Sequence, residues 1–205
     1  MTLRLNGSSS GFTEINAPAA AGSNTITLPT SNGSANQTLK NGSTAGTLEF
    51  VTHRGFVTYA IICDQKADTV DGGTFTSGAW RTRDLNTEIA DPDGIVSISS
   101  NQFTLGAGTY LIEASANAHD VARHQTRIYN ATDTSVVQYG MNELLGTGDT
   151  VSSTSLVVGR TTITASKAFE IQHRCQSTRS DSGFGVAADF GGVEIYTLVR
   201  IYKEA

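Results

Sequence analysis

The chain has 205 residues, of which 14 are basic, 19 are acidic and 38% are apolar, and its formal net charge is −5. No block of like charge occurs, which argues against a nucleic-acid partner because a phosphate backbone requires a clustered basic face. No apolar run approaches the roughly 20 residues that a membrane-spanning helix needs, so we expect no membrane span.

Residues 1–55 predict an extended arm without a core of its own. The segment is rich in Gly, Ser, Thr, Asn and Ala, and its turn dipeptides include Asn32-Gly33 and Asn41-Gly42. Its large apolar side chains form short islands, which suit short strands that bury one face against another molecule. The residues that we expect to anchor the arm are Phe12, Ile15, Ile26, Leu28 and Leu39. A disordered linker is the alternative.

The N-terminal sequence MTLRLNGSSSG lacks the hydrophobic stretch of a secretory signal. We therefore expect the protein to be made in a reducing cytoplasm and assembled there. Cys63 and Cys175 each lie in an apolar strand pattern. In such a compartment two buried thiols are favoured over a disulfide.

From residue 56 to residue 205 the pattern is a succession of short strands separated by turn signals such as Asp91-Pro92-Asp93-Gly94. The expected strands cover 59–63, 80–85, 95–99, 103–105, 109–117, 125–130, 134–139, 155–165, 169–175 and 193–202. The best helical candidate, 141–145, is too short to matter. This pattern predicts an all-β fold, an antiparallel jelly-roll sandwich, rather than an α/β fold.

The last expected strand is apolar on both sides. One set is expected to face the core, namely Val193, Ile195, Thr197, Val199 and Ile201. The other set faces outward, where a sandwich strand normally meets water, and an apolar stripe there indicates an interface. Leu111 breaks the alternation of its own strand in the same way. We therefore predict a subunit interface formed by Tyr196, Leu198, Tyr202 and Leu111.

Three stretches resemble proteins of tailed bacteriophages. The arm, with Asn16-Ala17-Pro18 and Leu48-Glu49-Phe50, is similar to a segment at the front of fibre and spike proteins, especially of phages that infect cyanobacteria and marine bacteria. The stretches 79–86 and 103–110 resemble phage-borne jelly-roll domains of the tumour-necrosis-factor type, and 192–201 is similar to their terminal strand. The resemblance implies a homotrimeric head, with its terminal strand near the three-fold axis, carried on a virion whose other proteins bind the arm.

The function expected from this resemblance is that of a phage structural protein, a trimeric fibre or spike head. The chain contains no collagen-like, coiled-coil or β-helical shaft, so capsid decoration is an alternative. A head that binds host surface polysaccharide is another alternative. The expected loops 65–79, 117–125, 140–154 and 176–192 carry few aromatic residues, namely Phe75, Phe184 and Phe190, which favours a scaffolding role.

Candidate catalytic residues are weak. Asp181-Ser182-Gly183 is similar to the nucleophile turn of chymotrypsin-like proteases, and Ala118-His119-Asp120 could supply a base. The protease pattern requires glycine before the aspartate and after Gly183, whereas Ser180 and Phe184 stand there. We predict no catalytic residues and no enzymatic activity.

Candidate metal ligands are equally sparse, and we predict neither a metal nor a cofactor. His119, Asp120 and His124 lack a second ligand cluster. His173 and Cys175 share one strand face with apolar neighbours, which favours a packed core. The acidic turns, Asp68 with Asp71 and Asp91 with Asp93, lack the dense spacing of a calcium loop.

Overall fold

The computed structural model describes residues 3–16, 19–20, 22–35, 37–52, 55–144, 146 and 151–205. Within these ranges every regular element is a β-strand, and all pairings between named strands are antiparallel. The described residues include no helix of the length and apolarity required to span a membrane. The chain divides into two compact units, Met1–His53 and Arg54–Ala205.

The first unit contains two short hairpins. Strand β1 (Leu3–Asn6) pairs with β2 (Phe12–Ile15), and β3 (Gln37–Asn41) pairs with β4 (Leu48–Thr52). The apolar residues expected to anchor the arm are Phe12, Ile15, Ile26, Leu28 and Leu39, and their side chains are 45% to 70% exposed. These residues therefore form no core within the unit, and their anchoring role stays a prediction.

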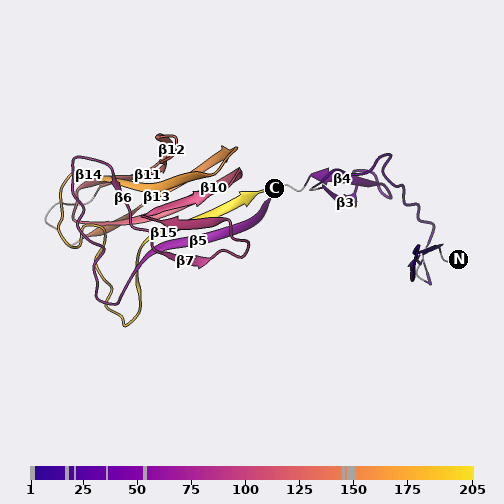
Figure 1. Ribbon diagram of the computed structural model, residues 1–205, viewed down its shortest axis with the longest axis horizontal. Helices are drawn as coiled ribbons and strands as arrows, with labels where there is room; N and C mark the ends of the chain where they lie inside the picture. The colour runs from indigo at the N-terminus through magenta and orange to yellow at the C-terminus, as the bar shows by residue number, and fades with distance from the viewer. Residues whose placement is uncertain are drawn as a thin grey trace. The chain divides into compact units, whose positions relative to one another are not determined.

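The second unit, which we call the head, is a sandwich of two sheets (Figure 1). The five-stranded sheet has the order β13-β10-β15-β5-β7, with bounds β5 (Phe56–Lys66), β7 (Thr87–Ala90), β10 (Gly108–His119), β13 (Ser152–Ile163) and β15 (Glu194–Glu204). The six-stranded sheet has the order β12-β11-β14-β9-β8, and β6 also pairs with β14. Its bounds are β6 (Arg81–Thr82), β8 (Val96–Ser99), β9 (Gln102–Leu105), β11 (Arg123–Asn130), β12 (Ser135–Leu144) and β14 (Lys167–Cys175). Neighbouring strands are mostly non-consecutive in sequence, as in a jelly roll, so the predicted fold class is confirmed.

The core of the head lies between the two sheets and follows from strict alternation along the strands. In β10, Ile112 faces inward and lies opposite Ile201 of β15. On the facing sheet Phe103 and Phe169 stack with ring centroids 5.6 Å apart. Each fully buried side chain of this size contributes about 1.5–3 kcal/mol to the stability of the head.

The described part of the head contains eleven strands, whereas the sequence pattern predicts ten. Strand β7 was not expected, because the sequence Thr87-Glu88-Ile89-Ala90 has only one large apolar side chain. The segment 141–145, dismissed as a helix from the sequence, is a strand in its described part, because residues 141–144 extend β12. Residue 145 lies outside the described residues.

The terminal strand β15 contains a β-bulge that reverses the expected facing of one residue. Its register with β5 shifts between Ile195 and Thr197, which changes the phase of the alternation. Tyr196 is consequently 3% exposed and faces inward, and its hydroxyl donates to the carbonyl of Val70 at 2.8 Å. Ile195 and Val193, expected in the core, are 41% and 57% exposed. The expectation that Tyr196 faces outward is therefore wrong.

The guanidinium of Arg83 holds this bulge from inside the sandwich. Arg83 is fully buried, and its Nε donates to the Thr197 hydroxyl at 2.8 Å. Its Nη2 donates to the carbonyls of Tyr196 at 3.0 Å and Phe184 at 3.1 Å, and its Nη1 donates to the carbonyl of Asn117 at 3.2 Å. Burial lowers the pKa of Arg83 to about 10, so the group is charged at neutral pH.

Replacing Arg83 should strongly destabilise the head. Arg83→Met removes the donor from three backbone carbonyls that are buried or part-buried, and we expect a loss of roughly 3–5 kcal/mol in the free energy of unfolding, measured by urea titration. The matched control is Arg160→Met, because Arg160 is exposed and an exposed ion pair contributes at most about 1 kcal/mol. Equal stabilities of the two variants would contradict the role assigned to Arg83.

Candidate functional site

The outer face of the five-stranded sheet carries a contiguous set of apolar side chains. Residues opposite one another in an antiparallel register point to the same side. The register places Leu111 opposite Tyr202, and Tyr202 opposite Tyr59. We define the outer apolar face as Tyr59, Ile61, Leu111, Leu156, Val158, Leu198 and Tyr202.

Three of the four residues predicted at a subunit interface lie on this face. Leu111, Leu198 and Tyr202 are half-buried there, whereas Tyr196 points into the core and offers no surface. The most exposed members were missed, namely Tyr59 at 43%, Leu156 at 47% and Val158 at 55%. A signal was available in the run Leu156-Val157-Val158, which is apolar on both sides of its strand, as in β15.

Charged side chains divide and border the outer apolar face. Glu113 and Arg200 lie directly opposite each other near its centre, and both are half-buried. At the margin Arg160 binds Glu204 through two hydrogen bonds of 2.8 and 2.7 Å. The face therefore combines apolar area with charges of both signs, one pair of them near its centre.

A second feature is a pocket at the end of the head farthest from Phe56. The register puts Phe56 beside Glu204, while the opposite ends of the strands bring together His119, Arg123 and Cys175. We call this cavity of about 800 Å³ the distal pocket. Residues of three strands and of the segment before β6 line it, among them Trp80, Arg123, Gln125, Asn142, Arg174 and Gln176. Sequence reasoning missed it because these residues meet only in the folded chain.

Trp80 forms one wall of the distal pocket, and neighbouring side chains hold it in position. The guanidinium of Arg127 lies 4.2 Å from the centre of the Trp80 ring and 4.9 Å from that of Tyr129. Two bonds from Arg127 to Gln172 Oε1, of 2.8 and 2.6 Å, hold that guanidinium in place. Tyr139 packs against the indole with ring centroids 5.9 Å apart. The indole is thus oriented before any ligand arrives.

Beneath the pocket lies a buried pair of histidines. His124 Nδ1 is 2.9 Å from His173 Nε2, and His124 Nε2 is 2.8 Å from the Ser153 hydroxyl. His173 Nδ1 is buried and has no hydrogen-bond partner among the described residues. Burial, with the nearby charge of Arg83, lowers the pKa of His124 to about 4 and that of His173 well below its usual value. Both rings are therefore neutral at physiological pH.

The neutral histidines make stability depend on pH. In the unfolded chain a histidine has a pKa of about 6.5, so below that pH only the unfolded state gains protons. We expect the free energy of unfolding to fall between pH 6.5 and about 4, by up to about 1.4 kcal/mol per pH unit for each histidine. Urea titrations across this range should show a shallower slope for His124→Gln than for the unaltered chain. Parallel slopes would contradict the assignment.

The residues weighed as catalytic do not assemble into a triad. His119 Nδ1 pairs with the Ser152 hydroxyl at 3.0 Å rather than with Ser182. Ser182 is buried, and its hydroxyl accepts a hydrogen bond from Arg179 Nε. The same arginine forms an ion pair with Asp120, in which Nη1 lies 3.1 Å from Oδ2. This arrangement ties loops together at the distal end of the head.

The two cysteines, and His173 on the same strand face as Cys175, lie in packed regions of the head. Cys63 and Cys175 are free, buried thiols, as predicted. Burial raises the pKa of Cys175 to about 11, and its Sγ lies 3.8 Å from the carbonyl of Phe75. The ring of Phe75 packs against His173 with centroids 4.7 Å apart, which agrees with the interpretation as core.

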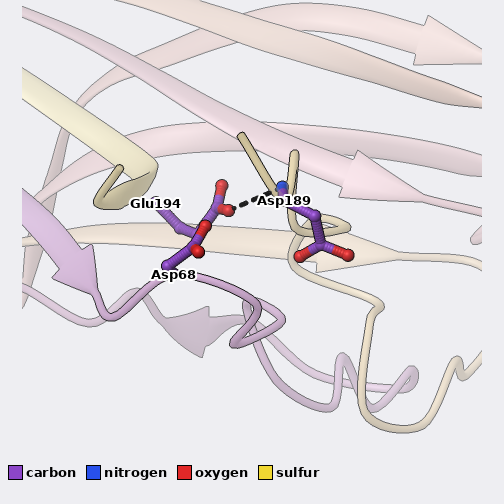
Figure 2. A group of neighbouring side chains, drawn as sticks. All are labelled: Asp68, Asp189 and Glu194. Carbon is purple, nitrogen blue, oxygen red and sulfur yellow. Dashed lines mark hydrogen bonds between the residues drawn. The ribbon is translucent and has the colours of Figure 1, made fainter. Parts of the chain in front are cut away.

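Three carboxylates meet at another loop, in a combination that sequence reasoning did not foresee. Asp68, Asp189 and Glu194 have oxygens within 4.8 Å of one another (Figure 2). Glu194 accepts the backbone N–H groups of Ala188 and Asp189, each at 3.0 Å, and these bonds lower its pKa. Asp68 accepts the N–H of Gly191 at 3.1 Å. The acidic group thus fixes the loop before β15.

The remaining acidic candidates also serve turns. Asp71 is not part of this group, and its carboxylate accepts the N–H of Ala187 at 2.8 Å. Asp91 accepts the N–H groups of Ile95 and Val96, each at 2.9 Å, and so closes the turn before β8. These carboxylates satisfy backbone donors that the loops would otherwise leave unpaired.

No protein-family model matches the sequence, and no curated protein matches it. Among solved structures, the chain is similar to the globular domain of zebrafish complement 1qA protein, with 11% identity and a TM-score of 0.47 over 71% of this chain and 96% of that one. Murine APRIL at pH 8.0 gives 10% identity and a TM-score of 0.42 over 71% and 98%. Eiger TNF from S. frugiperda gives 9% identity and a TM-score of 0.48 over 74% and 94%.

Proposed function

We propose that this protein is a structural component of a bacteriophage virion. Its head forms a homotrimer through the outer apolar face, and its N-terminal unit anchors the head to other virion proteins. The virion origin draws on the sequence resemblance of the arm and of the head to phage fibre and spike proteins. The observation that carries the self-association is the exposed apolar set on one sheet, since monomeric proteins rarely leave such a face open to water.

The outer apolar face has the features needed for contact between identical copies. It lies on a rigid five-stranded sheet, so little conformational entropy is lost when a partner covers it. Glu113 and Arg200 lie opposite each other and carry opposite charges, so in a head-to-tail ring the carboxylate of one copy can face the guanidinium of the next. Each fully covered leucine, valine or tyrosine contributes roughly 1.5–3 kcal/mol to the assembly.

A charge placed on the outer apolar face should give monomers. In Leu198→Asp and Val158→Asp a carboxylate would have to be buried at the contact, at a cost of several kcal/mol. Size-exclusion chromatography with light scattering measures the mass of the particle in solution. Val158 is 55% exposed in the single chain, so its variant should fold normally.

The matched control for this experiment is Phe190→Asp. Phe190 is an apolar side chain that is 94% exposed and lies in the loop before β15, outside the outer apolar face. This variant should remain trimeric. A trimeric Val158→Asp variant, or a monomeric unaltered chain, would count against the proposed interface.

The arm offers the features expected of a segment that binds by adding strands to a partner. Its hairpins leave strand edges whose backbone groups can pair with another chain, and main-chain hydrogen bonds of this kind require little of side-chain identity. The exposed fractions of Ile26 and Leu28 are both 70%, so they supply apolar contacts that the unit itself does not bury.

Charges in the arm should block incorporation while leaving the head intact. We expect the double variant Ile26→Asp with Leu28→Asp to be trimeric and absent from purified particles, as measured by quantitative mass spectrometry. The control Thr30→Asp with Ser31→Asp adds the same charge at exposed polar positions and should be incorporated. Normal incorporation of the first variant would refute anchoring through these residues.

Copy number separates the fibre or spike role from capsid decoration. The same mass-spectrometric measurement on unaltered particles would give hundreds of copies for a decoration protein and a few dozen or fewer for a tail appendage. A polysaccharide-binding head is a further candidate, and the distal pocket is the observation that favours it.

A further inference from the structure

We propose that the distal pocket binds an acidic saccharide, a sugar bearing a carboxylate group, such as a uronic acid unit of a polysaccharide. The inference goes beyond the structural role proposed above and does not depend on trimer formation. It rests on three properties of the pocket, namely an aromatic side chain held in position, two arginines and three side-chain amides.

The aromatic wall suits one side of a sugar ring. A pyranose has an apolar surface of C–H groups as well as polar hydroxyls, and a rigid aromatic ring provides contact area at low entropic cost. Trp80 is half-buried, and Arg127 and Tyr139 fix its orientation. The rim beside it is also held, because Arg81 donates to the carbonyls of Thr76 and Ser77 at 3.1 and 3.3 Å.

The two arginines select for a carboxylate. Arg123 and Arg174 both line the pocket from exposed positions at the ends of β11 and β14. Arg123 donates to Gln176 Oε1 at 3.0 Å through Nη1, which leaves other N–H groups of its guanidinium for a ligand. Bonds between guanidinium and carboxylate are short and strong, and they are frequently bidentate.

The amides provide partners for sugar hydroxyls. Gln125, Asn142 and Gln176 line the pocket, and each side-chain amide can both donate and accept. Gln125 is held by a bond from its Nε2 to the carbonyl of Gly140 at 2.9 Å. Glu143 adds an acceptor, and the pocket retains a positive balance because two arginines stand against this single carboxylate and His124 is neutral.

The position of the pocket is suited to contact with a long polymer. It lies at the end of the head opposite Phe56, where the chain enters the fold, and it is built on the six-stranded sheet. The outer apolar face belongs to the other sheet. The ligand site and the proposed contact between subunits therefore lie on different sheets, and neither blocks the other.

The single tryptophan of the chain makes binding directly measurable. Trp80 is the only tryptophan in 205 residues, so a change of tryptophan emission under tryptophan-selective excitation reports on this pocket. The full-length protein is titrated with trigalacturonate, and calorimetry gives the affinity independently. We expect a saturable fluorescence change with trigalacturonate and at least tenfold weaker binding of its methyl ester, which lacks the carboxylate charge.

Variants of the pocket test the assignment further. Arg174→Gln should weaken binding by roughly tenfold to hundredfold, the effect of losing a charge-assisted hydrogen bond. Trp80→Ala, followed by calorimetry, should weaken it comparably. Arg160→Gln is the matched control, because it removes an exposed arginine on the other sheet and should leave the affinity unchanged. Arg174 is exposed, so Arg174→Gln should fold normally. The proposal therefore remains testable even if Trp80→Ala does not fold.

Three results would overturn the proposal. They are no fluorescence change and no heat with trigalacturonate, equal binding of the methyl ester, or unchanged affinity in Arg174→Gln. The monomeric Val158→Asp variant separates this inference from the proposed function, since it should bind trigalacturonate with the same affinity per chain. Failure of sugar binding would leave the trimer intact, and failure of the trimer would leave sugar binding intact.

Discussion

The hydrogen bonds of the buried Arg83 guanidinium hold the distal half of the head together. The guanidinium joins the end of β10, the bulge in β15 and the loop at Phe184 through hydrogen bonds to backbone carbonyls and one hydroxyl. A buried cation is costly unless its donors are used, and these acceptors offset that cost. The same charge helps to keep His124 and His173 neutral. Arg83 therefore affects both the bulge of β15 and the charge state of the histidines beneath the distal pocket.

The fold could be predicted wherever local alternation decides which way a side chain points. In strand β10 burial alternates with a period of two from Tyr110 to Ala118, and the inward residues, including Ile112, are those that the pattern indicates. The prediction failed at Tyr196 because a bulge changes the phase of β15, and that bulge is held by Arg83, which lies 113 positions away in sequence. Contacts at such separation leave no trace in local periodicity.

The two candidate surfaces differ in how visible they are in the sequence. Leu111 and Leu198 signal the outer apolar face because an apolar residue there violates the usual pattern of a sandwich strand. The distal pocket gave no such signal, since Arg123, Asn142 and Arg174 look like ordinary polar residues at strand ends. Trp80 gave no signal of a binding site because the sequence pattern places it in a strand, whereas it immediately precedes strand β6.

The placement of the distal pocket and the outer apolar face on different sheets has a consequence for affinity. The proposed trimer, assembled through one sheet, would display three copies of the proposed saccharide site on the other sheet. When one site engages a repeating polymer, the neighbouring sites meet the next units at a high effective concentration, and overall avidity can exceed that of a single site by about 10²–10⁴. In the proposed trimer a pocket that binds weakly on its own would then suffice for firm yet reversible attachment, because individual sites would release and rebind while the assembly stays in place.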